Sequence, residues 1–356
     1  MDKDKPGLGM RGRGAASNAP SRFLEWTREA EPNDDIPPEG RVPTALFDDR
    51  AKTVISWNQS PDIPFDRSVN PAKGCELGCI YCYARPLHAY LGLSPGLDFE
   101  TRIFVKRDAA AVLRGELSRP GYRPGVLALG AATDPYQPFE RELGITRQIL
   151  EVLAEFKHPV SVTTKGALVE RDIDLLAPLA AQGLAQVNIS LPTLDPELAR
   201  RLEPRATAPH RRVETLRRLA EAGIPTAVLV APIIPALTDH EIEHILDTAA
   251  AAGVSQAAYV LLRLPREVRD LFVEWLEQHY PDRANHVMSL VRQAREGRDY
   301  DARFGSRMSG AGNYADLIRQ RFQLACRRHG LNERALDLRT DLFHRPAPPS
   351  PQLALF

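Results

Sequence analysis

The sequence of 356 residues predicts an α/β fold: a partial (βα)6 barrel of the TIM type, with a C-terminal helical extension and disordered termini. Three observations lead to this prediction. Short apolar segments recur about every 30 residues, which is the length of a βαβ unit. Amphipathic segments lie between them with short connections. Both ends of the chain lose apolar periodicity and are rich in Gly, Pro and charged residues.

The strands are predicted from six segments. Five of them are rich in Val, Leu, Ile and Ala with little polar alternation, as in strands buried on both faces of a parallel sheet. A weaker candidate, "DRSVNPAKG", directly precedes a cysteine-rich loop. Six units favour a barrel over a doubly wound sheet, and functional groups of such barrels lie at the C-terminal ends of the strands. The five clear segments are residues 125–133, 159–165, 185–191, 225–233 and 256–264.

Helices are predicted between these strands. Thr146 is the expected N-cap of one helix. Gly183, Gly223 and Gly253 stand where the residue after a helix adopts a left-handed conformation. After residue 264 the pattern becomes helical, first in "REVRDLFVEWLEQHY" and then in "YADLIRQRFQLACRRHG".

Four regions follow along the chain. Residues 1–45 are predicted to be a disordered N-terminal arm, in which "RFLEW" is a short piece that could dock on the body. Residues 46–270 are predicted to form the barrel domain and residues 271–340 the helical extension. Residues 341–356 are expected to be a Pro-rich flexible tail.

Charge and hydropathy narrow the class of protein. The 46 basic residues balance the 46 acidic ones, so the whole chain has no bulk attraction to nucleic acid or to an anionic membrane. No apolar run is long enough to span a bilayer, and the N-terminus lacks the apolar core of a signal peptide. We therefore expect a cytoplasmic protein without a membrane partner.

The segment "KGCELGCIYCYARP" holds three of the four cysteines, Cys75, Cys79 and Cys82, in the pattern C-x3-C-x2-C. A structural zinc site needs a fourth ligand, usually in a second pair, which the spacing does not provide. A redox C-x-x-C would leave Cys75 unexplained. Three unrelated buried cysteines would not cluster in a polar loop. A [4Fe–4S] cluster suits three thiolates, because one iron then stays open to a small molecule.

This motif, with an aromatic residue before its last cysteine, resembles that of radical S-adenosylmethionine (SAM) enzymes. Within that superfamily, residues 70–270 resemble the spore photoproduct lyase group. The resemblance implies a [4Fe–4S] cluster on the three cysteines and SAM bound to its open iron. It further implies reductive cleavage of SAM to a 5′-deoxyadenosyl radical, with a flavodoxin- or ferredoxin-type electron donor.

The resemblance also implies roles for residues near the cluster. Tyr81 is expected near the adenine of SAM, and Tyr83 is the expected hydrogen-atom relay. Thr133 and Lys165 match the hydroxyl and ammonium groups that contact SAM, since an ammonium suits the carboxylate of SAM. Weaker candidates for the cofactor site are Asn188, Ser190 and Arg205.

One position departs from the lyase group. The lyase has a hydrogen-donating cysteine where this chain has Ala131, so the resemblance does not imply the lyase reaction by that route. Cys326 is the remaining thiol, and its amphipathic surroundings predict a buried core position. Hydrogen could instead return from 5′-deoxyadenosine or from Tyr83.

Two further features suggest partners. The segments 200–218 and 303–330 are basic and could line a groove for the phosphates of nucleic acid, which we expect as the substrate. RNA or protein as substrate, and a non-catalytic iron–sulfur or zinc protein, stay open as alternatives. The last residues, "QLALF", resemble the motif by which bacterial DNA repair and replication proteins bind the sliding clamp. Its predicted contact residues are Gln352, Leu353, Leu355 and Phe356.

Overall fold

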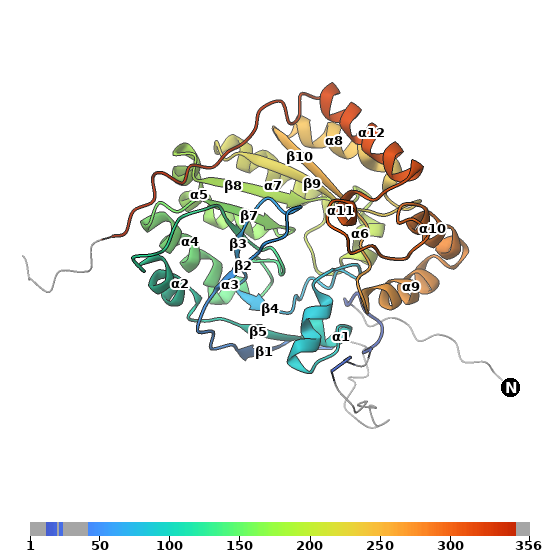
Figure 1. Cartoon of the computed structure of the whole chain (residues 1–356), viewed down its shortest axis with the longest axis horizontal. Helices are drawn as coiled ribbons and strands as arrows, with labels where there is room; N and C mark the ends of the chain where they lie inside the picture. The colour runs from blue at the N-terminus through green and yellow to red at the C-terminus, as the bar shows by residue number, and fades with distance from the viewer. Residues whose placement is uncertain (1–11, 20, 24–41, 347–356) are drawn as a thin grey trace, which may run out of the picture.

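The computed structural model describes residues 12–19, 21–23 and 42–346, and its centre is a seven-stranded sheet (Figure 1). The strand order is β10-β9-β8-β7-β6-β3-β2. Every neighbouring pair is parallel except β2 with β3. The prediction of a partial (βα)6 barrel is therefore confirmed, with each predicted strand present and β2 added at one edge. The strands are β2 (Ile55–Trp57), β3 (Arg67–Val69), β6 (Leu127–Leu129), β7 (Val160–Thr164), β8 (Ala185–Ser190), β9 (Thr226–Ile233) and β10 (Gln256–Leu261).

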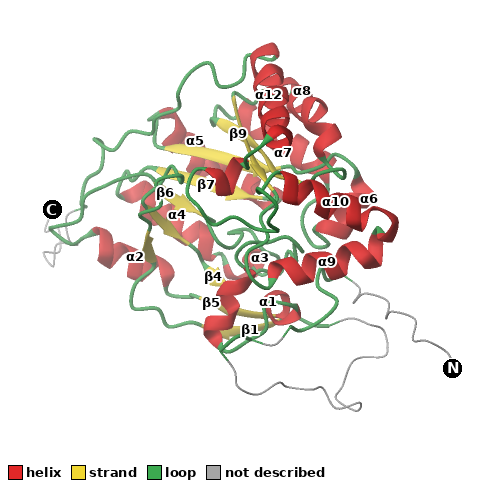
Figure 2. Ribbon diagram, turned by 45° about the vertical axis from the view of Figure 1, so that its right-hand side comes forward, coloured by secondary structure: helices red, strands yellow, loops and turns green. Residues whose placement is uncertain are grey.

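The helices of the βα units pack their apolar faces onto the sheet in one large core (Figures 1 and 2). Short 3-10 segments precede two of them, and two further helices lie in the loops after β6 and β8. The helices of the units are α2 (Ala109–Leu117), α4 (Ile145–Glu155), α5 (Ile173–Ala181), α7 (Pro209–Glu221) and α8 (Ile242–Ala251). The other elements are α3 (Glu140–Leu143), η2 (Ala167–Asp172), α6 (Pro196–Leu202) and η3 (Asp239–Glu241).

The structure confirms the three glycines that were predicted to follow helices, but not the threonine that was predicted to begin one. Gly183, Gly223 and Gly253 follow α5, α7 and α8 with φ of 72°, 73° and 89°, as predicted. The prediction for Thr146 is wrong, because α4 begins one residue earlier, after Gly144. The Thr146 hydroxyl donates to the carbonyl of Pro135, 2.5 Å away, and its N–H donates to the Glu140 carboxylate. This threonine ties the helix to the preceding loop instead of capping it.

A second, three-stranded sheet in the order β1-β5-β4 lies beside the cysteine loop. Sequence analysis missed it because its strands have only two to four residues and β1 is exposed at every position. It supports the loop, since β4 ends directly before Gly74, and η1 and α1 lie between the loop and β5. The elements are β1 (Ala45–Asp48), β4 (Ala72–Lys73), η1 (Arg85–Leu91), α1 (Leu97–Thr101) and β5 (Arg102–Val105).

Part of the predicted disordered arm is placed against the body instead. Arg13 is buried and donates to the backbone carbonyl of Glu100, 2.8 Å away. Arg22 forms an ion pair with Glu267 at 2.7 Å, and the ring of Phe23 lies 5.0 Å from that of Tyr90. These contacts are made by side chains of the arm, whose partners lie far away in the sequence and are not revealed by the local pattern.

The C-terminal helices pack on the same body. Helix α12 contributes Ile318, Phe322 and Cys326 to the large core, so Cys326 is a buried core residue as predicted. Helix α9 begins at Val268, slightly before the predicted start of the extension, and places Trp275 in a second apolar cluster with the cysteine loop. No helix in the described ranges is long and apolar enough to cross a membrane. The four helices are α9 (Val268–His279), α10 (Pro281–Gln293), α11 (Ser306–Ser309) and α12 (Asn313–Arg328).

Candidate active site

The three clustered cysteines lie on one buried loop between β4 and η1. All three are free thiols; Cys75 and Cys79 are buried and Cys82 is half-buried. Burial raises the pKa of each thiol. They would therefore become thiolates only when a bound metal takes up their charge. Three such donors suit an iron–sulfur cluster.

A buried arginine fixes the conformation of this loop. Arg85 is fully buried, and its guanidinium donates to the backbone carbonyls of Cys79 at 2.9 Å and Gly78 at 3.1 Å. It also donates to two carbonyls before α1 and forms an ion pair with buried Glu100 at 2.5 Å. Arginine is suited to this because its planar fork satisfies several acceptors at once. The loop backbone is thereby held in one conformation.

The same carboxylate holds the N-terminal segment. The backbone N–H groups of Gly14 and Ala15 each donate to Glu100, at 2.9 Å. A Cβ on Gly14 would lie 1.8 Å from the carbonyl oxygen of Gly78, so no other residue fits without moving the loop. Residues near the start of the chain therefore pack directly on the cysteine loop.

Glu203 is the centre of a buried polar network beside the thiols. It accepts hydrogen bonds from the Tyr81 hydroxyl and from Arg212, and the Lys165 ammonium lies 3.7 Å away. Lys165 also donates to the Ser190 hydroxyl at 2.8 Å. Although burial opposes its charge, Arg212 and Lys165 hold the pKa of the Glu203 carboxyl below its usual range. The structure thus brings together Tyr81, Lys165 and Ser190, three of the predicted cofactor residues.

Sequence analysis missed Glu203 and Arg212, both of which are almost completely buried. Their only signal is a charged pair in the segment "EPRATAPHRR", which looks like solvated surface. Helix α6 ends against the loop, where the Ile80 N–H donates to the Leu202 carbonyl at 3.0 Å. This contact is what carries Glu203 into the site.

The side chains of the other predicted cofactor residues bind groups of this chain. The Thr133 hydroxyl donates to the Ala72 carbonyl at 2.8 Å. The amide nitrogen of Asn188 donates to groups of β7, including the Val162 carbonyl at 3.1 Å. Arg205 forms an ion pair with Glu76 at 2.8 Å. Thr133 and Asn188 keep acceptor oxygens for a ligand, whereas the charge of Arg205 is already compensated.

Tyr83 lies next to Ala131, at the exposed side of the cysteine loop. Its side chain is 47% exposed, and its hydroxyl donates to the backbone carbonyl of Ala131, in the loop after β6. The guanidinium carbon of Arg263, just after β10, lies 5.3 Å from the centre of the Tyr83 ring. Tyr83 therefore spans the mouth of the barrel between two strands that are not neighbours.

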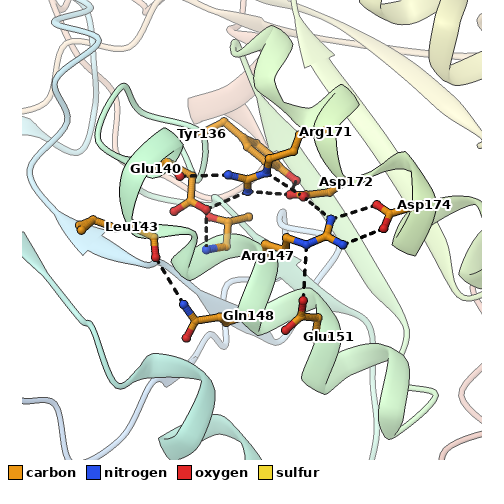
Figure 3. A network of polar contacts seen from close by, with 10 residues as sticks. Tyr136, Glu140, Leu143, Arg147, Gln148, Glu151, Arg171, Asp172 and Asp174 are labelled. Carbon is orange, nitrogen blue, oxygen red and sulfur yellow. Dashed lines mark hydrogen bonds and ion pairs between the residues drawn. The ribbon is translucent and has the colours of Figure 1, made fainter.

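An ion-pair network fixes the loop after β6 next to the segment after β7 (Figure 3). The buried carboxylate of Asp172 accepts from the Tyr136 hydroxyl at 3.1 Å and pairs with Arg147 and Arg171. In the same loop, Asp134 accepts from the backbone N–H of Lys165 at 2.7 Å. Asp134 thus fixes the backbone where Lys165 leaves β7.

The basic segment 200–218 is not a free cationic face. Of its seven arginines, six pair with carboxylates of the described chain, so their charge serves the fold. The pairs are Arg201–Glu197, Arg205–Glu76, Arg211–Glu170, Arg212–Glu203, Arg217–Glu214 and Arg218–Glu214.

Comparison with known proteins decides the family. The model of the radical SAM superfamily matches residues 69–249, which include the cysteine loop and most of the barrel. The chain belongs to the radical SAM superfamily. Radical SAM proteins use a [4Fe–4S] cluster and SAM, so these are its cofactors. An uncharacterised protein of Mycobacterium tuberculosis is 36% identical over 295 residues, which cover 82% of this chain and 80% of that protein.

One solved structure and one further relative are also similar to this radical SAM chain. The structure of spore photoproduct lyase complexed with dinucleoside spore photoproduct has the same fold, with a TM-score of 0.55, 15% identity and 80% of each chain covered. The radical SAM Nα-GlyT isomerase of Pseudomonas phage M6 is 23% identical over 226 residues, which cover 63% of this chain and 45% of the isomerase.

Proposed function

We propose that this radical SAM chain acts on nucleic acid, in the repair or modification of DNA. The observation that carries the radical chemistry is the buried loop with Cys75, Cys79 and Cys82 at the mouth of a (βα)6 barrel, beside Lys165. When bound and reduced, the cluster supplies the electron that cleaves SAM to methionine and a 5′-deoxyadenosyl radical. RNA or protein as substrate is the second candidate.

The residues of the chain would then bind and orient. The three cysteines would hold the cluster, and Lys165 would bind the SAM carboxylate from its position near Ser190. Tyr81 and Asn188 would flank the nucleoside part, and Thr133 would offer an acceptor oxygen. Glu203 keeps Tyr81 and Lys165 in place by accepting from one and neutralising the other. For Arg205 we propose only a supporting role through Glu76.

The absence of a thiol at Ala131 points to a different return of hydrogen. Tyr83 supports this proposal, because its hydroxyl already contacts the backbone at Ala131 and its side chain is 47% exposed at the mouth. A phenol at this place could exchange a hydrogen atom with a substrate radical, whereas the methyl group of alanine cannot.

Nucleic acid as the substrate is supported by one similarity in fold. The spore photoproduct lyase structure of the same fold is complexed with dinucleoside spore photoproduct. We expect a flavodoxin- or ferredoxin-type protein to deliver the electron.

Product analysis tests this function. We expect reduced, cluster-loaded protein with SAM to release 5′-deoxyadenosine and to change ultraviolet-damaged or base-modified DNA, as followed by mass spectrometry. The Tyr83→Phe variant should still release 5′-deoxyadenosine but form about tenfold less DNA product, because the hydrogen relay is lost. Tyr90→Phe, at a ring that is 66% exposed, is the matched control and should behave as wild type. Unchanged DNA together with a changed RNA or protein would contradict the proposal.

We also propose that the C-terminal segment binds the bacterial sliding clamp. Residues 352–356 lie outside the described residues, and the proposal depends on the sequence "QLALF" behind a Pro-rich segment. Deletion of residues 352–356 should abolish binding of the full-length protein to purified clamp in surface plasmon resonance. The double variant Gln352→Ala and Phe356→Ala should weaken binding by about tenfold or more. Full-length protein that fails to bind the clamp would refute this proposal.

A further inference from the structure

Arg263 lies at the mouth of the barrel, and its guanidinium has only weak hydrogen-bond partners among the described residues. It follows β10 and stacks over the ring of Tyr83 at 5.3 Å. Among the described residues, its terminal nitrogens donate only to the sulfur of Met308 at 3.5 Å and the hydroxyl of Tyr300 at 3.4 Å. The contact to the Tyr300 hydroxyl is long, and both acceptors are weak or neutral. Within the described residues, no carboxylate pairs with Arg263.

One atom of Arg263 is left without any partner. Its Nε is buried and has no hydrogen bond within the part of the chain that the structure describes. A buried N–H without a hydrogen-bond acceptor destabilises the folded state. Such a group therefore indicates either an acceptor from outside the chain or a functional role. The guanidinium is half-buried at a place where Tyr83 is open to solvent.

The surroundings of Arg263 are rigid, as a binding site requires. Buried Arg295 donates to the carbonyls of Leu261 and Leu262 at the end of β10, at 3.2 and 3.0 Å. The same guanidinium donates to the carbonyls of Ser306 and Arg307, at 2.8 and 3.0 Å. The loop that carries Tyr300 and Met308 is therefore tied to the strand that carries Arg263.

Two more contacts lock this loop. Arg307 binds both carboxylate oxygens of Asp62, at 2.7 and 2.6 Å. Gly310 has a φ of 78°, and a Cβ there would lie 2.7 Å from Leu261. A loop anchored in this way loses little conformational entropy on binding, so the surroundings of Arg263 are preorganised.

We infer that Arg263 binds a phosphodiester group of the substrate, with the exposed ring of Tyr83 beside it for an adjacent base. An arginine without a carboxylate partner is a donor for phosphate oxygens, and the flat face of a tyrosine suits a base. This inference rests on the proposed function, because it names the substrate group that this site would recognise. Arg263 would position the substrate backbone, next to the residue proposed to relay hydrogen.

The test compares the salt dependence of binding among three variants of the cluster-loaded protein. Fluorescence anisotropy with a short fluorescein-labelled oligothymidylate, from about 50 to 200 mM salt, gives affinity and slope. Arg263→Gln should bind about tenfold more weakly, with the slope of log K against log salt reduced by about 0.7, the value for one phosphate. Arg263→Lys keeps the charge, so it should retain the slope while losing part of the affinity.

The control is Arg339→Gln, which removes an exposed arginine paired with Asp341 and should leave affinity and slope unchanged. Wild-type affinity and slope in Arg263→Gln would overturn the inference about Arg263 and leave the proposed function standing. If the wild-type protein binds neither the DNA probe nor its RNA equivalent, the inference and the proposed substrate class both fail. Iron content of each variant shows that a loss of binding is not a loss of the cluster.

Discussion

Replacing Cys79 with alanine should remove the iron–sulfur cluster and abolish SAM cleavage. Cys79 lies in the middle of the cysteine loop, and two remaining thiols cannot hold the cluster stably. After anaerobic reconstitution, we expect iron content to fall from about four per chain toward zero. Release of 5′-deoxyadenosine should fall on the order of a thousandfold or more. Iron analysis, visible absorption and product chromatography measure the three quantities.

Cys326→Ala is the matched control for this result. Cys326 is also a buried free cysteine, but it lies on α12 in the large apolar core. Its replacement should leave iron content and SAM cleavage at wild-type levels. The assignment of the loop would be wrong if Cys79→Ala kept its cluster, or if Cys326→Ala lost it.

Replacing Glu100 with glutamine should destabilise the protein and loosen the cysteine loop. Glu100 and Arg85 are both fully buried, so the change leaves the charge of Arg85 without its partner. Breaking such a buried pair costs about 3–5 kcal/mol in the free energy of unfolding. It also weakens the two hydrogen bonds from the backbone of Gly14 and Ala15. Urea denaturation under anaerobic conditions measures the loss of stability, and iron content measures the effect on the loop.

Glu155→Gln provides the comparison at the surface. Glu155 pairs with Arg114, and both side chains are substantially exposed, at 37% and 47%. Such a pair contributes about 0–1 kcal/mol, so the urea midpoint should barely move. Equal effects of Glu100→Gln and Glu155→Gln would show that the buried pair does not hold the cysteine loop.

The strands and the cysteine motif could be predicted because they depend on local patterns. Residues 160–164 and 185–190, for example, are short segments with buried Val and Ile side chains, and their spacing along the chain already indicates parallel strands. The end of a helix at Gly183 follows from its left-handed conformation, which glycine favours. The prediction of Thr146 as a cap was wrong, because a threonine hydroxyl can equally bind a carbonyl from another segment.

The polar contacts around the site could not be predicted in this way. Arg85 has the sequence context of a loop arginine, yet it is fully buried and paired with Glu100, 15 residues away. Glu203 and Arg212 look like members of a charged surface segment, yet both are buried beside Tyr81. Burial of a charge depends on partners brought together by the whole fold, which local composition does not encode.

The sequence by itself determined the superfamily chemistry and the strand framework, because Cys75, Cys79 and Cys82 and the apolar segments lie in short, characteristic patterns. Only the tertiary structure decided which charges serve the site. It paired six of the seven arginines in residues 200–218 with carboxylates and left Arg263 over Tyr83 without one. The physical reason is that a charge is available to a ligand only where the folded chain does not already compensate it, and this depends on distances between segments far apart in sequence.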